Sequence, residues 1–381
     1  MSRSVQRASA ARERVLPWLK AEGLPGLVLT RPGPVSWLTG GLPPPVDRSA
    51  ATDLVWAVLS GESESATLIT TEVEADRITE EYQPGRHGFA ELVAVPWYDP
   101  DAFVRAAAGA AGAPASALAS DGHPAFGTDS SDDLTALRLA LSGAEQDDLR
   151  ALGADAAAAL EGALAAWSPG ERDLDIQARV AAALEARGAD APVLIVGGDD
   201  RVRRYRHPMA VGAPVRHLAM AVVVARRGGL HAAATRFASA VPLSAELQAL
   251  WEKVRRIEAA TLTASVPGYS YGDVLAALDR GYAAEGAAGG WAGHYQGGPI
   301  GYAQREFEIA PGRGGSRWPG VRIEPGHAVA WNPSLPGGAK AEDTYLVHAD
   351  GLERVTTGAG WPTGEGTGSI PPRPLVLEVR S

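Results

Sequence analysis

Two polar stretches in the last quarter of the chain decide how the rest is interpreted. The first is Gly-His-Tyr-Gln-Gly-Gly-Pro-Ile-Gly-Tyr-Ala-Gln-Arg-Glu (293–306), and the second is Trp-Asn-Pro-Ser-Leu-Pro-Gly-Gly-Ala-Lys-Ala-Glu-Asp-Thr (331–344). Both place charged and amide side chains among glycines and prolines, and strand-like apolar residues such as Ile300 and Tyr345 are interleaved with them. Glycine lets the backbone approach a ligand closely, so the pattern favours a binding site over its alternative, a polar surface loop.

The composition is that of a globular protein with room for more than one core. The chain has 381 residues, of which 45% are hydrophobic and 21% charged, and this length is enough for two domains. The formal net charge of −10 argues against a nucleic-acid-binding surface. The absence of cysteine excludes disulfides, thiolate zinc sites and a cysteine nucleophile.

The N-terminal residues and the apolar runs indicate where in the cell the protein is expected. The first 20 residues carry several arginines and no apolar core, so they do not predict a secretory signal. No apolar run reaches the length of about 18 residues that a membrane span needs. We therefore expect a cytoplasmic protein whose partner is a small molecule, not nucleic acid or a membrane.

The first 140 residues alternate between helical and strand patterns. A helix is expected over 5–22 and another over 72–82, with short apolar strands between and after them. The expected strands are 26–30, 53–59, 66–70 and 91–95. Such alternation is typical of an α/β domain, and we assign it to residues 1–140.

The remainder, residues 141–381, contains one pattern twice and ends in a Gly/Pro-rich tail. A long Ala/Leu helix is followed by Ser168-Pro169-Gly170 and a second helix, for which Asp173 is the expected N-cap. A second long helix is followed by Val266-Pro267-Gly268 and again by a shorter helix. This indicates an internal duplication whose two halves would face each other across a site.

These features resemble the pita-bread family, which includes methionine aminopeptidase, aminopeptidase P, prolidase, creatinase and ectoine hydrolase. The landmarks that carry the resemblance are His207, Thr235-Arg236, Gly297 to Gly301, Glu306 and Glu342-Asp343-Thr344. The resemblance implies an α/β N-terminal domain like that of creatinase and prolidase. It also implies an α+β pita-bread C-terminal domain with an internal pseudo-twofold repeat. Relatives of this branch are usually homodimers, so we expect a homodimer.

Peptidases of the family bind two metal ions through two Asp, one His and two Glu. The matching positions in this chain are Val222, Ala233, Gly298, Asn332 and Glu342, so only the last ligand is kept. Divalent ions need several carboxylate or imidazole ligands, and one Glu cannot supply them. We therefore expect neither a metal site nor another cofactor.

Cationic and polar residues lie in or beside the motif segments. An arginine can bind a substrate carboxylate through two parallel hydrogen bonds. The expected substrate-binding residues are Arg206, Arg236, His294, Gln296, Arg305, Asn332 and Lys340. Arg203 and Arg204 are expected to face solvent. Gln296 and the glycines after it are expected to supply donors to a substrate oxyanion.

The expected catalytic residues are His207, Glu342 and Glu306. In creatinase, as the resemblance implies, the His that matches His207 is the general acid/base, and a neutral imidazole suits that role near pH 6.5. We therefore predict a metal-independent, creatinase-like hydrolase acting on a non-peptide C–N bond of a small zwitterionic compound that carries a carboxylate and an amidine-like or guanidine-like group. The alternatives are a metal-free lyase or isomerase of specialised metabolism, a ligand-binding protein that kept the fold without catalysis and, least favoured, a dinuclear metallo-aminopeptidase.

Overall fold

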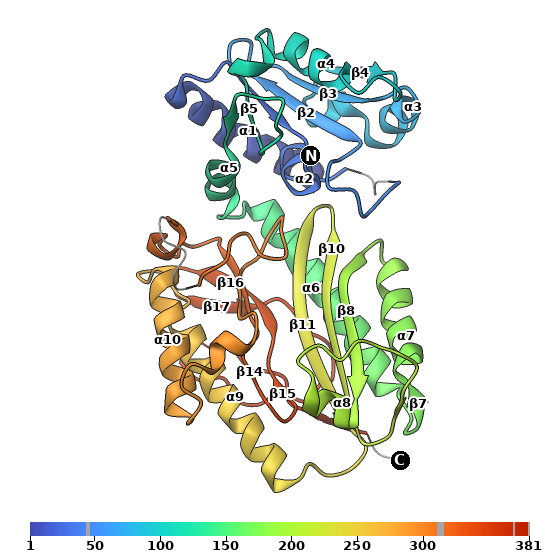
Figure 1. Cartoon of the computed structure of the whole chain (residues 1–381), viewed down its shortest axis with the longest axis vertical. Helices are drawn as coiled ribbons and strands as arrows, with labels where there is room; N and C mark the ends of the chain where they lie inside the picture. Colours follow the sequence, from blue (N-terminus) through green and yellow to red (C-terminus); the bar gives the residue numbers. More distant parts are fainter. Residues whose placement is uncertain (43–45, 311–315, 369, 380–381) are drawn as a thin grey trace. The chain divides into compact units, whose positions relative to one another are not determined.

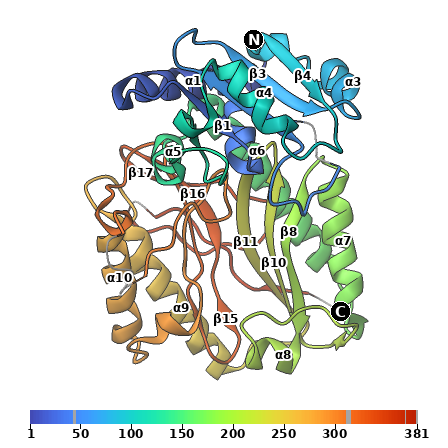
Figure 2. The same ribbon diagram turned by 45° about the horizontal axis from the view of Figure 1, so that its top comes forward.

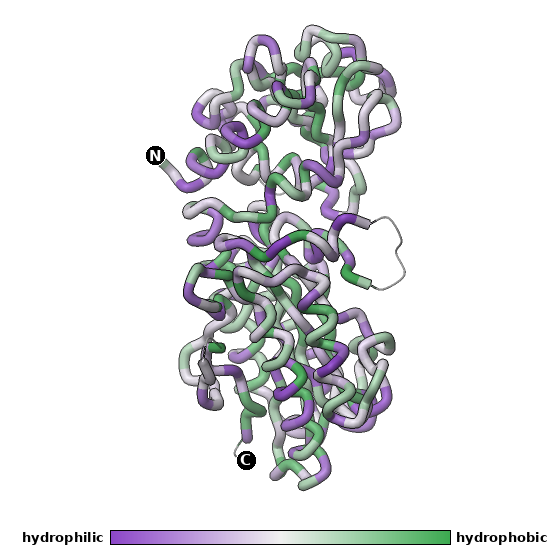
Figure 3. The backbone as a smooth tube through the Cα atoms, turned by 90° about the vertical axis from the view of Figure 1, so that its left-hand side faces the viewer, coloured by the Kyte–Doolittle hydropathy of each residue, from purple (hydrophilic) through white to green (hydrophobic). Residues whose placement is uncertain are grey.

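The computed structural model describes residues 1–42, 46–310, 316–368 and 370–379. These residues form two compact units, one of Met1–Glu145 with Gly228–Leu230 and one of Gln146–Arg227 with His231–Ser381 (Figure 1). Hydrophobic and hydrophilic residues alternate over short distances along the backbone (Figure 3). Accordingly, no helix within the described ranges combines the length and hydropathy needed to cross a bilayer.

The N-terminal unit is built on one six-stranded sheet with the order β4-β3-β2-β1-β5-β6. Its strands are β1 (Gly26–Leu29), β2 (Val55–Ser60), β3 (Ala66–Thr71), β4 (Glu91–Val95), β5 (Ala119–Ser120) and β6 (Thr128–Asp129). Its helices are α1 (Arg3–Glu22), α2 (Pro32–Thr39), α3 (Ala75–Arg77), α4 (Ala102–Ala111) and α5 (Ser131–Arg138). The central strands β1, β2 and β3 pair antiparallel, whereas β4, β5 and β6 join parallel to their neighbours.

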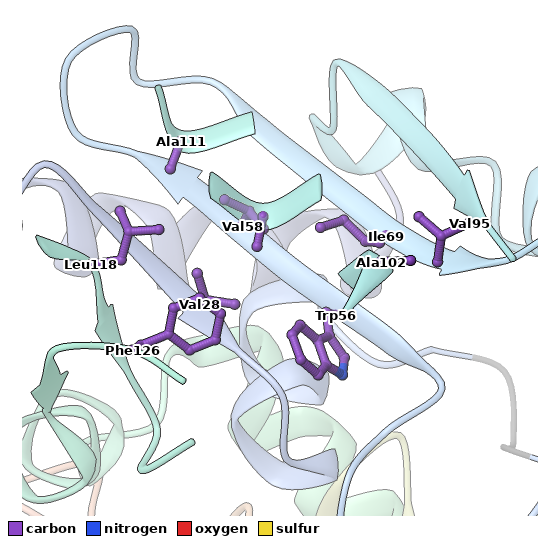
Figure 4. Packing of buried hydrophobic residues seen from close by; sticks show 10 residues of the cluster. Val28, Trp56, Val58, Ile69, Val95, Ala102, Ala111, Leu118 and Phe126 are labelled. Atoms are coloured by element: carbon purple, nitrogen blue, oxygen red, sulfur yellow. The ribbon is translucent and has the colours of Figure 1, made fainter. Parts of the chain in front are cut away.

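Apolar side chains of this sheet and of helix α4 form the core of the N-terminal unit. Val28, Val58 and Ile69 are buried on one face of the sheet, where they pack with Ala111 of α4 and Trp56 (Figure 4). The α/β prediction is therefore confirmed. The helix expected over 72–82 is only partly α-helical, because α3 passes into a π-helical turn at Ile78–Tyr82.

Among its described residues, the C-terminal unit contains two four-stranded sheets and five α-helices. The sheets have the orders β18-β11-β10-β8 and β12-β13-β16-β17. The strands are β7 (Glu171–Arg172), β8 (Asp190–Gly198), β9 (Pro214–Val215), β10 (Leu218–Arg227), β11 (Leu230–Ser239), β12 (Gly297–Pro299), β13 (Ala328–Trp331), β14 (Ser334–Leu335), β15 (Ala339–Lys340), β16 (Asp343–His348), β17 (Gly351–Arg354) and β18 (Leu377–Glu378). The helices are α6 (Gly143–Ala165), α7 (Asp173–Glu185), α8 (Asp199–Arg204), α9 (Ala245–Thr263) and α10 (Tyr271–Ala284).

Each half of this unit repeats the predicted order of a long helix, a turn, a shorter helix and strands. The strands lie between α7 on one side and α9 and α10 on the other (Figure 2). Helix α10 begins with a reciprocal capping box between Ser270 and Asp273, which explains its sharp start. Every residue of β11 is buried, so side chains on both of its faces are packed inside the protein.

The N-cap prediction for Asp173 is wrong. Asp173 is the first residue of α7, and the residue before it supplies no side-chain cap. The buried Asp173 carboxylate instead accepts hydrogen bonds from the backbone amides of Val211 and Gly212 and from Arg201. Asp173 therefore anchors α8 and the segment after it, which contains His207.

Candidate active site

A cavity of about 910 Å³ lies within the C-terminal unit. One wall is apolar and comes from the first half of the unit, with Pro192 to Ile195 on β8, Val222 and Val224 on β10, and Ala233 on β11. Val222 and Val224 share a face because side chains alternate along a strand. The other lining residues are mostly polar: His207, Met209, Tyr295, Gly297, Gln304, Arg305, Glu308, Asn332, Lys340 and Glu342. A cavity with one apolar wall and a few convergent polar groups is typical of small-molecule sites.

One histidine of this cavity contacts a second histidine that does not line it. The Nε2 atoms of His207 and His294 are 3.2 Å apart, and their ring centroids are separated by 4.9 Å. His294 is only 8% exposed, whereas His207 is exposed and lines the cavity. Because two protonated rings could not share this contact, at least one imidazole is neutral and one Nε2 accepts a hydrogen bond from the other.

The surroundings keep both rings neutral at physiological pH. Burial and the positive charges of Lys340 and Arg206 lower the pKa of His294 to about 3, and protonation of His207 would disfavour a second proton further. Burial, with Lys340 and Arg206, also lowers the pKa of His207, although Glu342 opposes the shift. Neutral imidazoles can both accept and donate protons, so this pair is a suitable proton relay.

Glu342 is the best-anchored acid of the cavity. The Thr235 hydroxyl donates to its Oε2 at 2.7 Å, the Lys340 ammonium lies 3.2 Å from the same atom, and Asn332 Nδ2 donates to Oε1 at 3.3 Å. All of these side chains are at least 90% buried. Asn332 Oδ1 has no hydrogen-bond partner among the described residues, so it is free to contact a ligand. The arrangement fixes a carboxylate beside a permanent cation.

Arg305 lines the same cavity as this ion pair. Its guanidinium stacks over the ring of Tyr295, 5.2 Å from the centroid, and pairs with Glu308. Burial lowers its pKa. Tyr295 and Glu308 are site residues that the sequence reasoning missed; the one available signal was their position beside the glycine motif.

The prediction that Arg236 binds substrate is not supported by its position. Its side chain is 0% exposed and does not line the large cavity. It pairs with Glu161 at 3.0 Å and Asp343 at 2.9 Å and donates to the carbonyl oxygens of Thr235 and Thr356. Protein groups take four of the five N–H donors of this guanidinium, which is buried away from the large cavity. We therefore assign Arg236 a structural role.

The structure also contradicts the roles predicted for Gln296 and Glu306. The Gln296 amide donates to the carbonyl oxygens of Trp291 and His294, both at 2.9 Å, and accepts from Tyr282 at 3.1 Å. It therefore holds the loop that carries His294 and cannot serve an oxyanion.

The Glu306 carboxylate is used in a similar way. It accepts from the backbone amides of Tyr302 and Ala303 and does not line the cavity. It thus stabilises a turn, and we remove it from the predicted catalytic set. Arg206 lines a smaller neighbouring pocket, together with Lys340.

The sequence and the fold of the chain are similar to those of known proteins. The sequence matches metallopeptidase family M24 over residues 147–349, more than half of the chain. The chain belongs to family M24. No curated protein matches it significantly.

Solved structures of M24-type peptidases share its fold. The Xaa-Pro dipeptidase from Bacillus anthracis is 20% identical with a TM-score of 0.71, covering 92% of this chain and 98% of its own. Dipeptidase PepE from Mycobacterium ulcerans is 22% identical with a TM-score of 0.72, covering 99% and 97%. The X-Pro aminopeptidase from Thermotoga maritima MSB8 is 16% identical with a TM-score of 0.69, covering 94% and 99%. At these identities the similarity establishes the fold, and the predicted pita-bread architecture is confirmed.

The residues of this M24 chain do not fit the metal pair that the family name implies. Val222, Ala233, Asn332 and Glu342 all line the cavity, and Gly298 adjoins the lining residue Gly297. The matched positions thus converge, but only one offers a carboxylate. Within the described parts of the chain, no three His, Asp or Glu side chains are grouped so that they could hold a metal ion. Lys340 also places a positive charge beside the remaining Glu, which disfavours a divalent cation there.

Proposed function

We propose that this M24 chain is a metal-independent, creatinase-like hydrolase. Its substrate would be a small zwitterion with a carboxylate and an amidine-like or guanidine-like group, and the bond cleaved would be a non-peptide C–N bond. The observation that carries the proposal is the His207–His294 pair, whose His207 lines the same cavity as the Lys340–Glu342 ion pair, where metal ligands are missing.

The histidine pair supports proton transfer in both directions. His207 takes a proton from the attacking water as the water oxygen bonds to the amidine carbon, and it then returns that proton to the departing nitrogen. His294, hydrogen-bonded to His207 and more deeply buried, holds the ring and stabilises its charged form by sharing the proton. Because its own pKa is low, His294 does not keep the proton, and both rings are neutral again before the next cycle.

Glu342 supports recognition of the cationic end of the substrate. An amidinium can bind a carboxylate through two parallel N–H···O bonds. Thr235, Asn332 and Lys340 fix the orientation of the Glu342 carboxylate before the substrate arrives. Preorganised groups of this kind lower the cost of binding and catalysis.

A direct assay tests the proposal. Protein treated with a chelator would be incubated with a panel of guanidino and amidino carboxylates, and products would be identified by mass spectrometry. We expect hydrolysis that survives chelation and is abolished by His207→Ala. His217→Ala is the matched control, because His217 is an exposed histidine that does not line the cavity.

The products distinguish this reaction from the alternatives. Hydrolysis adds one water to the sum of the products, a lyase splits the substrate without water, and an isomerase leaves its mass unchanged. Chelator-sensitive turnover, or activity of His207→Ala equal to that of His217→Ala, would refute the metal-independent mechanism through His207. Binding without turnover would instead identify a non-catalytic ligand-binding protein.

On the family resemblance we also propose that the protein is a cytoplasmic homodimer.

A further inference from the structure

A second, smaller pocket opens beside the active-site cavity and carries an unusual charge. Its volume is about 180 Å³, and Lys340 lies in the walls of both cavities. Arg203, Arg204 and Arg206 line it, and no Asp or Glu does. In a chain of net charge −10, this is a local excess of positive charge.

The arginines of the small pocket differ from their neighbour on the same helix. The Arg201 guanidinium on α8 donates hydrogen bonds to the Asp173 carboxylate at 2.9 Å and to the carbonyl oxygen of Met209. Arg203, Arg204 and Arg206, by contrast, have no carboxylate within 4.0 Å among the described residues. Like charges held together repel one another, and an oxyanion placed among them would relieve that repulsion.

The large cavity does not provide the same attraction. Its two permanent cations, Arg305 and Lys340, are each paired with a carboxylate of the same cavity, Glu308 and Glu342. The anionic end of a ligand therefore finds its uncompensated partners in the small pocket. An additional unused donor is present there, because Ser334, a residue only 2% exposed, lines the pocket and its hydroxyl has no hydrogen-bond partner among the residues that the structure describes.

We propose that this arginine pocket, formed by Arg203, Arg204, Arg206 and Ser334, binds the oxyanion of the substrate, a carboxylate or a phosphate. Guanidinium groups match the geometry of both anions. The substrate then extends from the arginine pocket past Lys340 into the large cavity, which His207 lines. The identity of this ligand as a substrate rests on the proposed hydrolase function, whereas anion binding by the pocket does not.

Calorimetric titration at low ionic strength tests the arginine pocket without any turnover. Inorganic phosphate and succinate are the probes, titrated separately into the wild-type chain, Arg206→Gln and the double variant Arg203→Gln/Arg204→Gln. Losing charge-assisted hydrogen bonds should weaken binding by about tenfold or more in both variants. The control is Arg280→Gln, which removes the same charge from an exposed position on α10.

The outcomes separate specific binding from general attraction. Preference for phosphate or for succinate identifies the oxyanion, and either supports the pocket. Absence of binding by both probes, or equal weakening in Arg280→Gln, would overturn it. His207→Ala should bind the anion like the wild type. If His207→Ala loses turnover but still binds the anion, both proposals are supported. If the wild-type chain binds the anion but hydrolyses no compound of the panel, the pocket is supported and the hydrolase function is rejected.

Discussion

The neutral state of His294 has a measurable consequence for stability. Its pKa is about 3 in the folded chain, against about 6.5 in an unfolded one. Between these values the unfolded state binds a proton that the folded state does not, so the free energy of unfolding falls as the pH is lowered through 6.5 toward 3. For this single group the loss amounts to about 2 kcal/mol between pH 7 and pH 5.

The substitution His294→Gln removes this titration and keeps a polar side chain of similar size. Urea unfolding at pH 7 and at pH 5 gives the fall in the free energy of unfolding between these pH values. We expect this fall to be about 2 kcal/mol smaller in the variant than in the wild type. Comparing the two chains at each pH cancels the contribution of titrating groups that do not interact with His294.

His217→Gln is the control, because the His217 side chain is 64% exposed. It should reproduce the wild-type pH dependence. If His294→Gln also reproduces it, then His294 is protonated in the folded chain or titrates near 6.5. The neutral-pair reasoning would then be refuted.

Three further predictions test the site and the assembly. Arg236→Met should cost about 3–5 kcal/mol of stability in urea unfolding, because it leaves Glu161 and Asp343 as buried, unpaired carboxylates; a near-neutral effect would return Arg236 to the candidate ligand residues. Lys340→Met should raise the pKa of His207, which Lys340 now lowers, and NMR titration of the ring would detect an upward shift of the midpoint; an unchanged midpoint would contradict the assigned electrostatics. Sedimentation of the purified chain should give the mass of a dimer, and a monomer at all concentrations would reject the homodimer.

The sequence was most informative where structure depends on local pattern. The long helices α6 and α9, the turns after them and the hairpin strands β10 and β11 follow from periodicity and turn chemistry, which act within a few residues. The two opening stretches also reach the cavity as predicted, through residues such as Asn332 and Glu342. Their glycines and interleaved strand residues were sufficient to indicate a site.

The sequence was least informative about the direction of individual side chains. Thr235 and Arg236 are adjacent on β11, so the alternation of a strand sends them to opposite faces. Thr235 reaches Glu342, whereas Arg236 enters the ion-pair network behind the sheet. Which face belongs to the cavity depends on how the two halves pack, and proximity to a motif cannot reveal it. Arg203 and Arg204 are exposed, as predicted, and they also line the small pocket.

The apolar wall of the cavity makes a metal site hard to build by single substitutions. Val222 and Ala233 are 2% and 3% exposed, so a substitution of either by Asp would bury a carboxylate with no unpaired cation to balance it. Such a change would destabilise the chain without completing a site, and the Lys340 ammonium would still repel the ion. Several substitutions would therefore have to occur together before this cavity could hold a metal ion.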